Sequence, residues 1–266
     1  MGLLDGKVAV ITGAASGIGR SGARIMAREG AIAVVADIDV AGARNTVTEI
    51  EAAGGRANAC PVDVRDSASV QSMVAETIDR HGRIDVLFHN AVSVPLINRQ
   101  DKRATELPDE IWRRIIDLVL SGTFYCAKYV GQTMLARRSG SIILTATTDA
   151  LIGQAGIDGY TAAKGGVVAM TRSMAAGLSP EGVRVNAICP GFVETPHQAA
   201  FLGVPEERAK IEALHLMPIL QPEDIAEFAT FLASDRARYM TGGIHTVDSG
   251  YSCFKGRLDL KGTIEA

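Results

Sequence analysis

The stretch from Val8 to Gly30 constrains the fold more than any other part of this 266-residue chain. A short apolar run, Val8-Ala9-Val10-Ile11-Thr12, is followed directly by a glycine-rich turn, and a helical pattern then continues from Arg20 to Glu29. In this order of strand, turn and helix, glycines let the backbone approach a pyrophosphate at the free N–H groups of a helix. The stretch therefore predicts a nucleotide site, with a tight turn that binds nothing as the alternative. Its predicted contacts are Gly13, Ser16, Gly17, Ile18 and Gly19.

A second predicted strand, Ala31 to Ala36, is followed by an acidic residue. Asp37 lies 24 residues after Gly13, about where the acidic residue of such a unit accepts hydrogen bonds from a ribose 2′-hydroxyl. Because a carboxylate there would repel a 2′-phosphate, the sequence favours NAD over NADP, with Ile38 as a neighbouring cofactor contact. Arg20 is the one nearby basic residue that argues for NADP. The alternative is that Asp37 only opens a turn.

The segment Tyr160-Thr161-Ala162-Ala163-Lys164 places a phenol and an ammonium on one face of a helix, because residues four apart are neighbours there. A phenol with a pKa near ~10 is a poor base at neutral pH, and an adjacent ammonium favours the phenolate. We therefore expect Lys164 to lower the pKa of Tyr160, and Tyr160 to act as a general acid and base. Alone this spacing is a weak signal, but the glycine-rich turn upstream strengthens it.

Together these features resemble the short-chain dehydrogenase/reductase family, over residues 5 to about 250. Thr12 to Gly19 is similar to the family's T-G-x-x-x-G-x-G, and Tyr160 to Lys164 to its Y-x-x-x-K. Further landmarks stand in the family's order: Asp63-Val64 after the third strand, His89-Asn90-Ala91-Val92 in place of N-N-A-G, and Pro190-Gly191 after the sixth strand. The additional cofactor contacts that the resemblance implies are Asp63, Val64, Asn90, Ala91, Tyr160, Lys164, Pro190, Gly191, Val193 and Thr195.

The resemblance also implies a reaction, the reversible hydride transfer between NAD and a secondary alcohol or its ketone. In that reaction Tyr160 exchanges a proton with the substrate oxygen, while Lys164 holds the nicotinamide ribose. Thr147 stands thirteen residues before Tyr160, where the family has a serine that hydrogen-bonds the substrate oxygen. Threonine keeps the hydroxyl group and adds a methyl. The implied catalytic set is Thr147, Tyr160 and Lys164, and the backbone of Val193 with the hydroxyl of Thr195 fixes the carboxamide.

Two valines depart from the family's pattern. Val92 replaces the glycine of N-N-A-G, and Val119 replaces the catalytic asparagine that follows Trp112 in the central helix. In the family that asparagine supports a water linking the lysine to solvent, and a valine side chain cannot hydrogen-bond. A cofactor-binding relative without catalytic activity is therefore an alternative function. A cofactor-free lyase similar to the halohydrin dehalogenases is disfavoured, because Lys164 and the glycine turn are both retained.

Apolar runs and helical patterns alternate along the chain, which predicts an α/β fold: a Rossmann-type doubly wound parallel sheet of about seven strands with helices on both faces. Because no linker or repeat interrupts this pattern, we expect residues 1–266 to form a single domain with a small substrate lid near 192–221. The expected strands are Val8–Thr12, Ala31–Ala36, Ala57–Pro61, Val86–His89, Ser141–Thr145, Arg184–Ile188 and Ile244–Val247.

Composition argues against several other classes of function. A net charge of −3 gives no electrostatic case for binding nucleic acid or an anionic membrane, and no apolar run reaches the ~18 residues of a membrane span. Met1 to Gly6 lacks the pattern of a signal peptide, so we expect a cytoplasmic protein. Dispersed cysteines without a histidine at ligand spacing predict buried thiols and no metal site; they are Cys60, Cys126, Cys189 and Cys253.

The expected substrate pocket is mostly apolar, because the lid segment is rich in phenylalanine, leucine, isoleucine and methionine. Such a lining suits a cyclic secondary alcohol or its ketone. The predicted substrate contacts are Val92, Thr147, Asp149, Gln154, Tyr160, Phe192 and His197.

The helix from Tyr160 to Leu178 carries Lys164 and Arg172 as its only charges. A helix that is apolar all round is covered on both sides, so we expect its second side to meet a copy of the chain through Gly165, Gly166 and Ala169. With the family resemblance this predicts a homotetramer, and a monomer is the alternative. The tail 251–266 extends past the family's usual end and either packs on a neighbouring subunit or frays.

Overall fold

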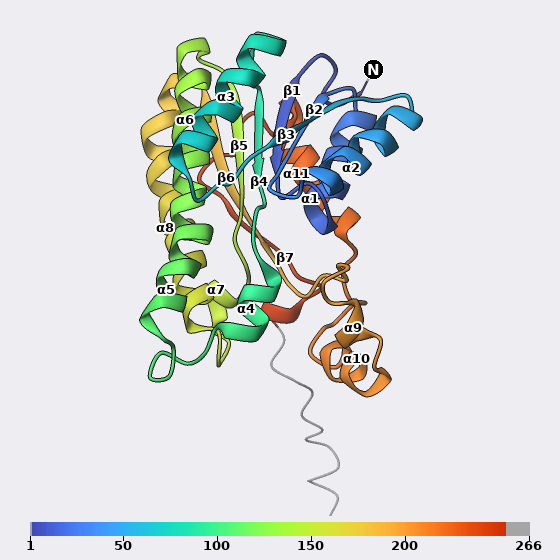
Figure 1. Cartoon of the computed structure of the whole chain (residues 1–266), viewed down its shortest axis with the longest axis vertical. Helices are drawn as coiled ribbons and strands as arrows, with labels where there is room; N and C mark the ends of the chain where they lie inside the picture. The colour runs from blue at the N-terminus through green and yellow to red at the C-terminus, as the bar shows by residue number, and fades with distance from the viewer. Residues whose placement is uncertain (1, 254–266) are drawn as a thin grey trace, which may run out of the picture.

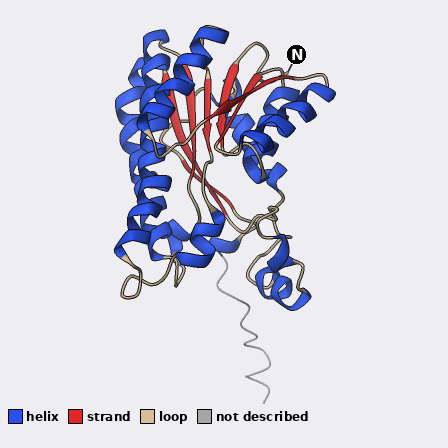
Figure 2. Cartoon of the chain, in the orientation of Figure 1, coloured by secondary structure: helices blue, strands red, loops and turns tan. Residues whose placement is uncertain are grey.

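Seven parallel strands form one sheet in the computed structural model, which describes residues 2–253 (Figures 1 and 2). The spatial order of the strands is β3-β2-β1-β4-β5-β6-β7. The strands are β1 (Val8–Thr12), β2 (Ile32–Asp37), β3 (Arg56–Pro61), β4 (Val86–His89), β5 (Gly140–Thr145), β6 (Val183–Pro190) and β7 (Ile244–Val247). The helices are α1 (Gly17–Arg28), α2 (Val40–Ala52), α3 (Ser67–His81), α4 (Val94–Gln100), α5 (Asp109–Ile116), α6 (Gly122–Arg137), α7 (Asp149–Ile152), α8 (Asp158–Leu178), α9 (Ala199–Leu202), α10 (Pro205–Glu212) and α11 (Pro222–Ala233).

Helices cover both faces of this sheet. Figure 1 shows α1, α2 and α11 on one side and α3, α6 and α8 on the other, and a separate hydrophobic core lies under each layer. Because successive residues of a strand point to opposite faces, neighbouring residues enter different cores. Leu87 and Ile142 belong to the core beneath α3, α6 and α8, whereas Phe88 and Ile143 belong to the core beneath α1 and α11.

The order of the strands reverses between β1 and β4. These two strands are far apart in the chain but pair side by side in the sheet, with Thr12 opposite His89 at their carboxyl ends. In doubly wound sheets, ligands bind outside the carboxyl ends of the strands at such a reversal. The glycine turn follows Thr12 and the Asn90-Ala91 motif follows His89, so the fold brings two of the predicted cofactor motifs together here.

The predicted fold class is confirmed, with small shifts in the bounds of its elements. β2 begins and ends one residue later than expected, so Asp37 is its last residue. β6 runs on to Pro190, and α8 begins at Asp158 rather than at Tyr160. The expectation for the tail lies outside the described residues from 254 onward. Within residues 2–253, no helix is both long enough and apolar enough to cross a membrane.

Candidate active site

The glycine turn packs too closely against its neighbours to accept side chains. A Cβ added to Gly13, where φ is +66°, would lie 2.8 Å from the Cα of Ala91. One added to Gly19 would lie 2.1 Å from the carbonyl oxygen of Gly13, and one on Gly17 would lie 3.3 Å from the Cγ2 of Thr195. The turn therefore lies between the loop after β4 and the segment after β6, two regions that the sequence analysis assigned to the cofactor.

The amino end of α1 is open toward this turn. Ser16 occupies the N-cap position, but its side chain makes no capping hydrogen bond, and the first turn of α1 contains no acidic residue. The N–H groups at the start of a helix carry a partial positive charge and bind anions. The residues present therefore fit the pyrophosphate of a dinucleotide.

Thr12 ties the glycine turn to the loop after β4 and also sets the protonation of His89. The Thr12 Oγ1 accepts hydrogen bonds from the backbone N–H groups of Asn90 at 3.1 Å and Ala91 at 3.3 Å. Both of its lone pairs are then used, so its proton is left for the His89 Nδ1, 2.9 Å away. The neutral ring therefore carries its own proton on Nε2, which is buried without a partner among the described residues. Burial, followed by the charge of Lys164, lowers the pKa of His89 to about 3, so the ring stays neutral at pH 7.

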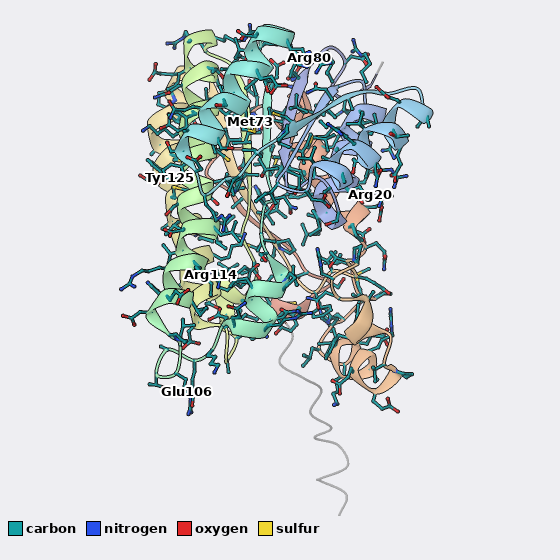
Figure 3. The ribbon with its side chains drawn as sticks, viewed as in Figure 1. Arg20, Met73, Arg80, Glu106, Arg114 and Tyr125 are labelled. Atoms are coloured by element: carbon teal, nitrogen blue, oxygen red, sulfur yellow. The ribbon has the colours of Figure 1, made fainter. Side chains whose placement is uncertain are left out.

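Asp37 presents a partly buried carboxylate beside the glycine turn. Its Oδ2 accepts the N–H of Ala15 and its Oδ1 that of Asp39, both at 2.9 Å, so each oxygen keeps a lone pair for a ribose hydroxyl. Arg20, the residue that argued for NADP, lies on the side of the molecule that carries α1 and α2 (Figure 3) and is paired with Glu49, with 3.0 Å between Nε and Oε2. The guanidinium of Arg20 is therefore already paired with a carboxylate.

Ile38, Asp63 and Val64 lie next to this edge of the sheet but present different groups. Ile38 is 65% exposed, so its side chain is available to pack against a ring. The carboxylate of Asp63 is bound bidentately by Arg65, with Nε–Oδ1 and Nη2–Oδ2 distances of 2.9 and 2.6 Å, and these bonds lower the pKa of Asp63. Val64 is buried against Gly122, so only its backbone is left for a cofactor.

Tyr160 and Lys164 share one face of α8, as the sequence predicts. The Lys164 Nζ lies 5.7 Å from the centroid of the Tyr160 ring and donates a hydrogen bond to the carbonyl oxygen of Thr145 at the end of β5. Burial lowers the pKa of Lys164 to about 8. An ammonium has three N–H donors, so two of them remain for the hydroxyls of a ribose.

Asp101, which is not among the residues predicted from the sequence, fixes the start of α8. Its Oδ1 accepts the N–H of Gly159 at 3.1 Å and its Oδ2 that of Tyr160 at 2.8 Å. These N–H groups have no partner within the helix, so the buried carboxylate caps the end of α8 that carries Tyr160. The two residues are 59 positions apart. No local pattern in the sequence could therefore have indicated the pairing.

The expected fall in the pKa of Tyr160 is wrong. Burial raises this pKa above its ordinary value, and the negative charge of Asp149 raises it further. The reason is that removing a phenol from water favours its neutral form, and here this effect exceeds any attraction from Lys164. Tyr160 therefore carries its proton at pH 7 and is ready to act as an acid.

Thr147 and Asp149 hydrogen-bond each other beside Tyr160. The Thr147 Oγ1 donates to the Asp149 Oδ2 at 3.0 Å and accepts the backbone N–H of Asp149 at 3.3 Å. Thr147 is buried and Asp149 is partly buried. Burial raises the pKa of Asp149, and the hydrogen bond from Thr147 opposes that rise. The structure thus brings together Thr147, Asp149 and Tyr160, three of the predicted site residues. The carboxylate of Asp149 gives this group a negative charge.

A π-helical turn, Asp117–Ser121, interrupts the long helix between α5 and α6 at the position of Val119. Such turns inside α-helices are frequent at functional sites. Val119 is fully buried, and its carbonyl oxygen accepts a hydrogen bond from the Thr123 Oγ1 at 2.5 Å. The backbone at Val119, where the sequence departs from the family's pattern, is therefore π-helical. The carbonyl oxygen of Val119 is already hydrogen-bonded by the Thr123 hydroxyl.

The segment after β6 carries the remaining predicted cofactor contacts. The carbonyl oxygen of Pro190 accepts both the N–H and the hydroxyl of Thr148 at 3.1 Å, which joins the ends of β5 and β6. Val193 forms a β-bridge with Leu220, and its carbonyl oxygen accepts the N–H of Thr195 at 2.8 Å. These bonds fix the backbone that leads into the predicted lid.

The other predicted substrate contacts differ in their exposure and in the neighbours that they contact. Val92 is 37% exposed, and the ring of Phe192 lies 6.3 Å from that of Phe201 in α9, between centroids. Gln154 and His197 are exposed, and their side chains form no hydrogen bonds within the described part of the chain. The structure therefore leaves these two polar side chains without an assigned contact.

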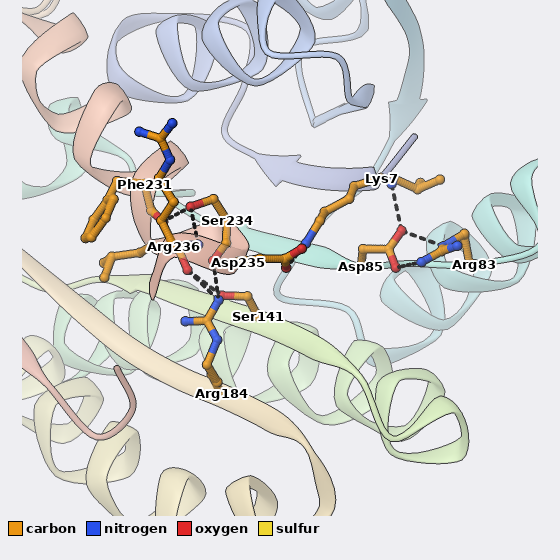
Figure 4. A network of polar contacts seen from close by, with 11 residues as sticks. Lys7, Arg83, Asp85, Ser141, Arg184, Phe231, Ser234, Asp235 and Arg236 are labelled. Carbon is orange, nitrogen blue, oxygen red and sulfur yellow. Dashed lines mark hydrogen bonds and ion pairs between the residues drawn. The ribbon is translucent and has the colours of Figure 1, made fainter. Parts of the chain in front are cut away.

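Two cavities are lined by residues outside this cluster. One, of about 600 Å³, is at the amino ends of the strands, and Figure 4 shows two charged pairs in its lining, Lys7 with Asp235 and Arg83 with Asp85. The other, of about 420 Å³, lies beside Trp112. Since doubly wound sheets bind ligands at the carboxyl ends of their strands, we do not assign the first of these cavities to the reaction.

Comparisons with known proteins agree with this architecture. A family model described as enoyl-(acyl carrier protein) reductase matches residues 13–252. The chain is 37% identical over 249 residues to cyclohexanol dehydrogenase of Acinetobacter sp. (strain SE19), covering 93% of this chain and 96% of that protein. It is 38% identical over 248 residues to cis-4-hydroxycyclohexanecarboxylate dehydrogenase of Sinomonas cyclohexanicum, with coverage of 92% and 96%. The crystal structure of gox2181 matches with a TM-score of 0.87 at 32% identity, covering 94% of this chain and 97% of that one.

The doubly wound parallel sheet and the Tyr–Lys pair on α8 agree with these matched oxidoreductases, whose family generally uses a nicotinamide cofactor. The chain belongs to the short-chain dehydrogenase/reductase family.

Proposed function

We propose that this chain is an NAD-dependent oxidoreductase that interconverts a secondary alcohol and its ketone by hydride transfer. The observation that carries the proposal is the cluster of Thr147, Tyr160 and Lys164 beside a glycine turn that excludes side chains. The names of the two matched dehydrogenases support a substrate with a six-membered ring. Exposed aliphatic side chains near the site suit such a ring; they are Leu151, Ile152, Leu214, Leu216 and Met217.

The residues of the cluster divide the proton chemistry between them. NAD, when bound, supplies the hydride acceptor for oxidation of the alcohol. Tyr160 takes the proton of the alcohol hydroxyl as a phenolate, and in the reverse direction it donates that proton to the ketone oxygen. Lys164 stabilises the phenolate by its charge and holds ribose hydroxyls with its two free N–H groups. Thr147 hydrogen-bonds the substrate oxygen.

We expect the wild-type protein to bind NADH at least about tenfold more tightly than NADPH, and Asp37→Ser to lose most of that preference. The reason is that the Asp37 carboxylate accepts from a ribose 2′-hydroxyl but repels a 2′-phosphate. Parallel titrations followed by nicotinamide fluorescence measure both affinities. Glu51→Ser, an exposed carboxylate on α2, is the matched control and should keep the wild-type preference. Equal affinity for the two cofactors would contradict the role of Asp37, and binding of neither would overturn the proposed function.

We propose a homotetramer built partly on α8. Gly165 faces open space and Ala169 is exposed, so both remain available to a second copy. Gly166 does not, because a Cβ there would lie 2.9 Å from the side chain of Leu120 in the same chain. Light scattering should give about four times the chain mass of 28.0 kDa. A mass near that of one chain would rule the tetramer out.

We further propose that residues 1–266 form one cytoplasmic domain, with α9 and α10 as the substrate lid near 192–221. Figure 1 shows these two short helices standing apart from the sheet, at the end where the strands terminate. The contact between Phe192 and Phe201 supports the lid, because it joins α9 to the segment that follows β6.

Val119 favours a second candidate function, a cofactor-binding protein without catalytic activity. Its buried aliphatic side chain cannot take part in proton transfer, and its carbonyl oxygen is already bound by Thr123. Such a protein would bind NADH tightly and turn over neither alcohols nor ketones. The intact pair Tyr160 and Lys164 favours the enzyme.

A further inference from the structure

The Thr147 hydroxyl has one proton, so it can donate a hydrogen bond to only one of three acceptors at a time. These acceptors are the substrate oxygen, the Tyr160 oxygen and the Asp149 carboxylate. In the structure this proton lies in the hydrogen bond from Thr147 to the Asp149 Oδ2. The second lone pair site of the Thr147 oxygen faces the N–H of Asp149. While this arrangement lasts, Thr147 cannot donate to a substrate oxygen.

The carboxylate of Asp149 is only half satisfied. Its Oδ2 receives the Thr147 hydroxyl, but its Oδ1 receives no hydrogen bond from the described residues, and no cation among them forms an ion pair with it. Its charge reaches both nearby phenols, because it raises the pKa of Tyr160 and that of Tyr251. Tyr251 lies in the short turn after β7 and stacks on His215, with 5.0 Å between ring centroids. The partly buried carboxylate of Asp149 therefore lies near Tyr160, and its Oδ1 can accept a further hydrogen bond.

We propose that Asp149 selects substrates that carry a second hydrogen-bond donor, a hydroxyl or an ammonium, close to the reacting carbinol. This inference rests on the proposed function and names its substrate class. A donor from the substrate takes the place of the Thr147 hydroxyl on Asp149. The Thr147 hydroxyl is then free to donate a hydrogen bond to the carbinol oxygen. It also screens the charge that opposes the Tyr160 phenolate. A substrate carboxylate would meet the Asp149 charge and be rejected.

The hydrogen-bond lengths limit where the second donor lies on the substrate. The Thr147 oxygen is 3.0 Å from the Asp149 Oδ2 and would bind the carbinol oxygen at about 2.8 Å. The carbinol oxygen and Asp149 are therefore at most about 6 Å apart, and the donor must reach the carboxylate within about 3 Å. A substituent on the carbon next to the carbinol, or on the one after it, meets this requirement.

A series of four ring alcohols tests the proposal with NAD as oxidant: cyclohexanol, cyclohexane-1,2-diol, 2-aminocyclohexanol and 2-hydroxycyclohexanecarboxylate. For the wild type we expect kcat/KM for the diol and the amino alcohol to exceed that for cyclohexanol at least about tenfold, with much of the gain in kcat. We expect the carboxylate to fall at least about tenfold below cyclohexanol. A merely structural role for Asp149 would change all four substrates alike.

The variants separate charge from hydrogen bonding. Asp149→Asn keeps an acceptor for Thr147 but removes the charge, so the advantage of the ammonium and the penalty of the carboxylate should each shrink at least about tenfold. Asp149→Ala should also remove the advantage of the diol. Glu51→Gln, an exposed carboxylate on α2, should keep every wild-type ratio. NADH titration shows that each variant is folded.

The outcomes distinguish this inference from the proposed function. Turnover of cyclohexanol with equal ratios in the wild type and in Asp149→Asn would overturn the role of Asp149 and leave the dehydrogenase intact. No turnover of any alcohol, and none of the matching ketones with NADH, would overturn the proposed function and this inference with it.

Discussion

Tyr160→Phe is expected to lower kcat for alcohol oxidation by about 10² to 10⁴-fold while NADH affinity stays close to that of the wild type. The size follows from the contribution that general acid–base catalysis usually makes. The substitution removes only the hydroxyl, so the ring keeps its place on α8 near Lys164. The backbone N–H of residue 160 also keeps its bond to Asp101. Steady-state formation of NADH measures the loss, and nicotinamide fluorescence measures the affinity.

Tyr125→Phe is the matched control for this experiment. Tyr125 lies on α6, is partly buried (Figure 3 labels it), and forms no hydrogen bond through its hydroxyl within the described residues. Its removal should leave turnover unchanged. Equal activity of Tyr160→Phe and the wild type would refute the assigned role, because no other hydroxyl is proposed as the proton donor. Loss of NADH affinity in step with activity would instead indicate a damaged cofactor site.

The parts of the site that the sequence predicted are those encoded in short segments. Gly13, Gly17 and Gly19 are close in the chain and meet the same turn, and Tyr160 and Lys164 are neighbours by the geometry of a single helix. The seven strands were predictable for a similar reason. A strand covered on both faces is a continuous apolar run, and the runs alternate with helical patterns.

The parts that the sequence did not predict depend on contacts across the fold. The cap that Asp101 places on α8 and the tautomer of His89 both arise from hydrogen bonds between segments more than fifty residues apart. The sign of the pKa shift at Tyr160 was predicted wrongly, because the spacing of Tyr160 and Lys164 reveals their proximity but not the burial of the phenol. The packing of Gly166 on Leu120 was missed for the same reason, since helical periodicity does not name the partner of a face.

Gly19→Ala is expected to weaken NADH binding by about a hundredfold or more, because the new methyl group displaces the turn that holds the pyrophosphate. Its Cβ would lie 2.1 Å from the carbonyl oxygen of Gly13, 2.7 Å from the carbonyl carbon of Gly13 and 3.0 Å from the Cα of Ala14. All three are backbone atoms, so no change of rotamer relieves the clash. Charge-assisted hydrogen bonds contribute about 1.5–3 kcal/mol each, and loss of one to two of them at the phosphates corresponds to this change in affinity.

Gly177→Ala separates this effect from the general cost of adding a methyl group to a helix. Gly177 is exposed near the end of α8, and a Cβ there meets nothing within 4 Å. Because glycine is less stable than alanine inside a helix, this control should raise the free energy of unfolding by about 0.5–1 kcal/mol and leave NADH affinity unchanged. Thermal unfolding with and without NADH gives the second readout, since a ligand that binds only the folded state raises the Tm by an amount that grows with the logarithm of its concentration divided by its Kd. The wild type and Gly177→Ala should show that rise, and Gly19→Ala should show little of it. An equal rise in all three proteins would mean that the cofactor does not bind at the glycine turn.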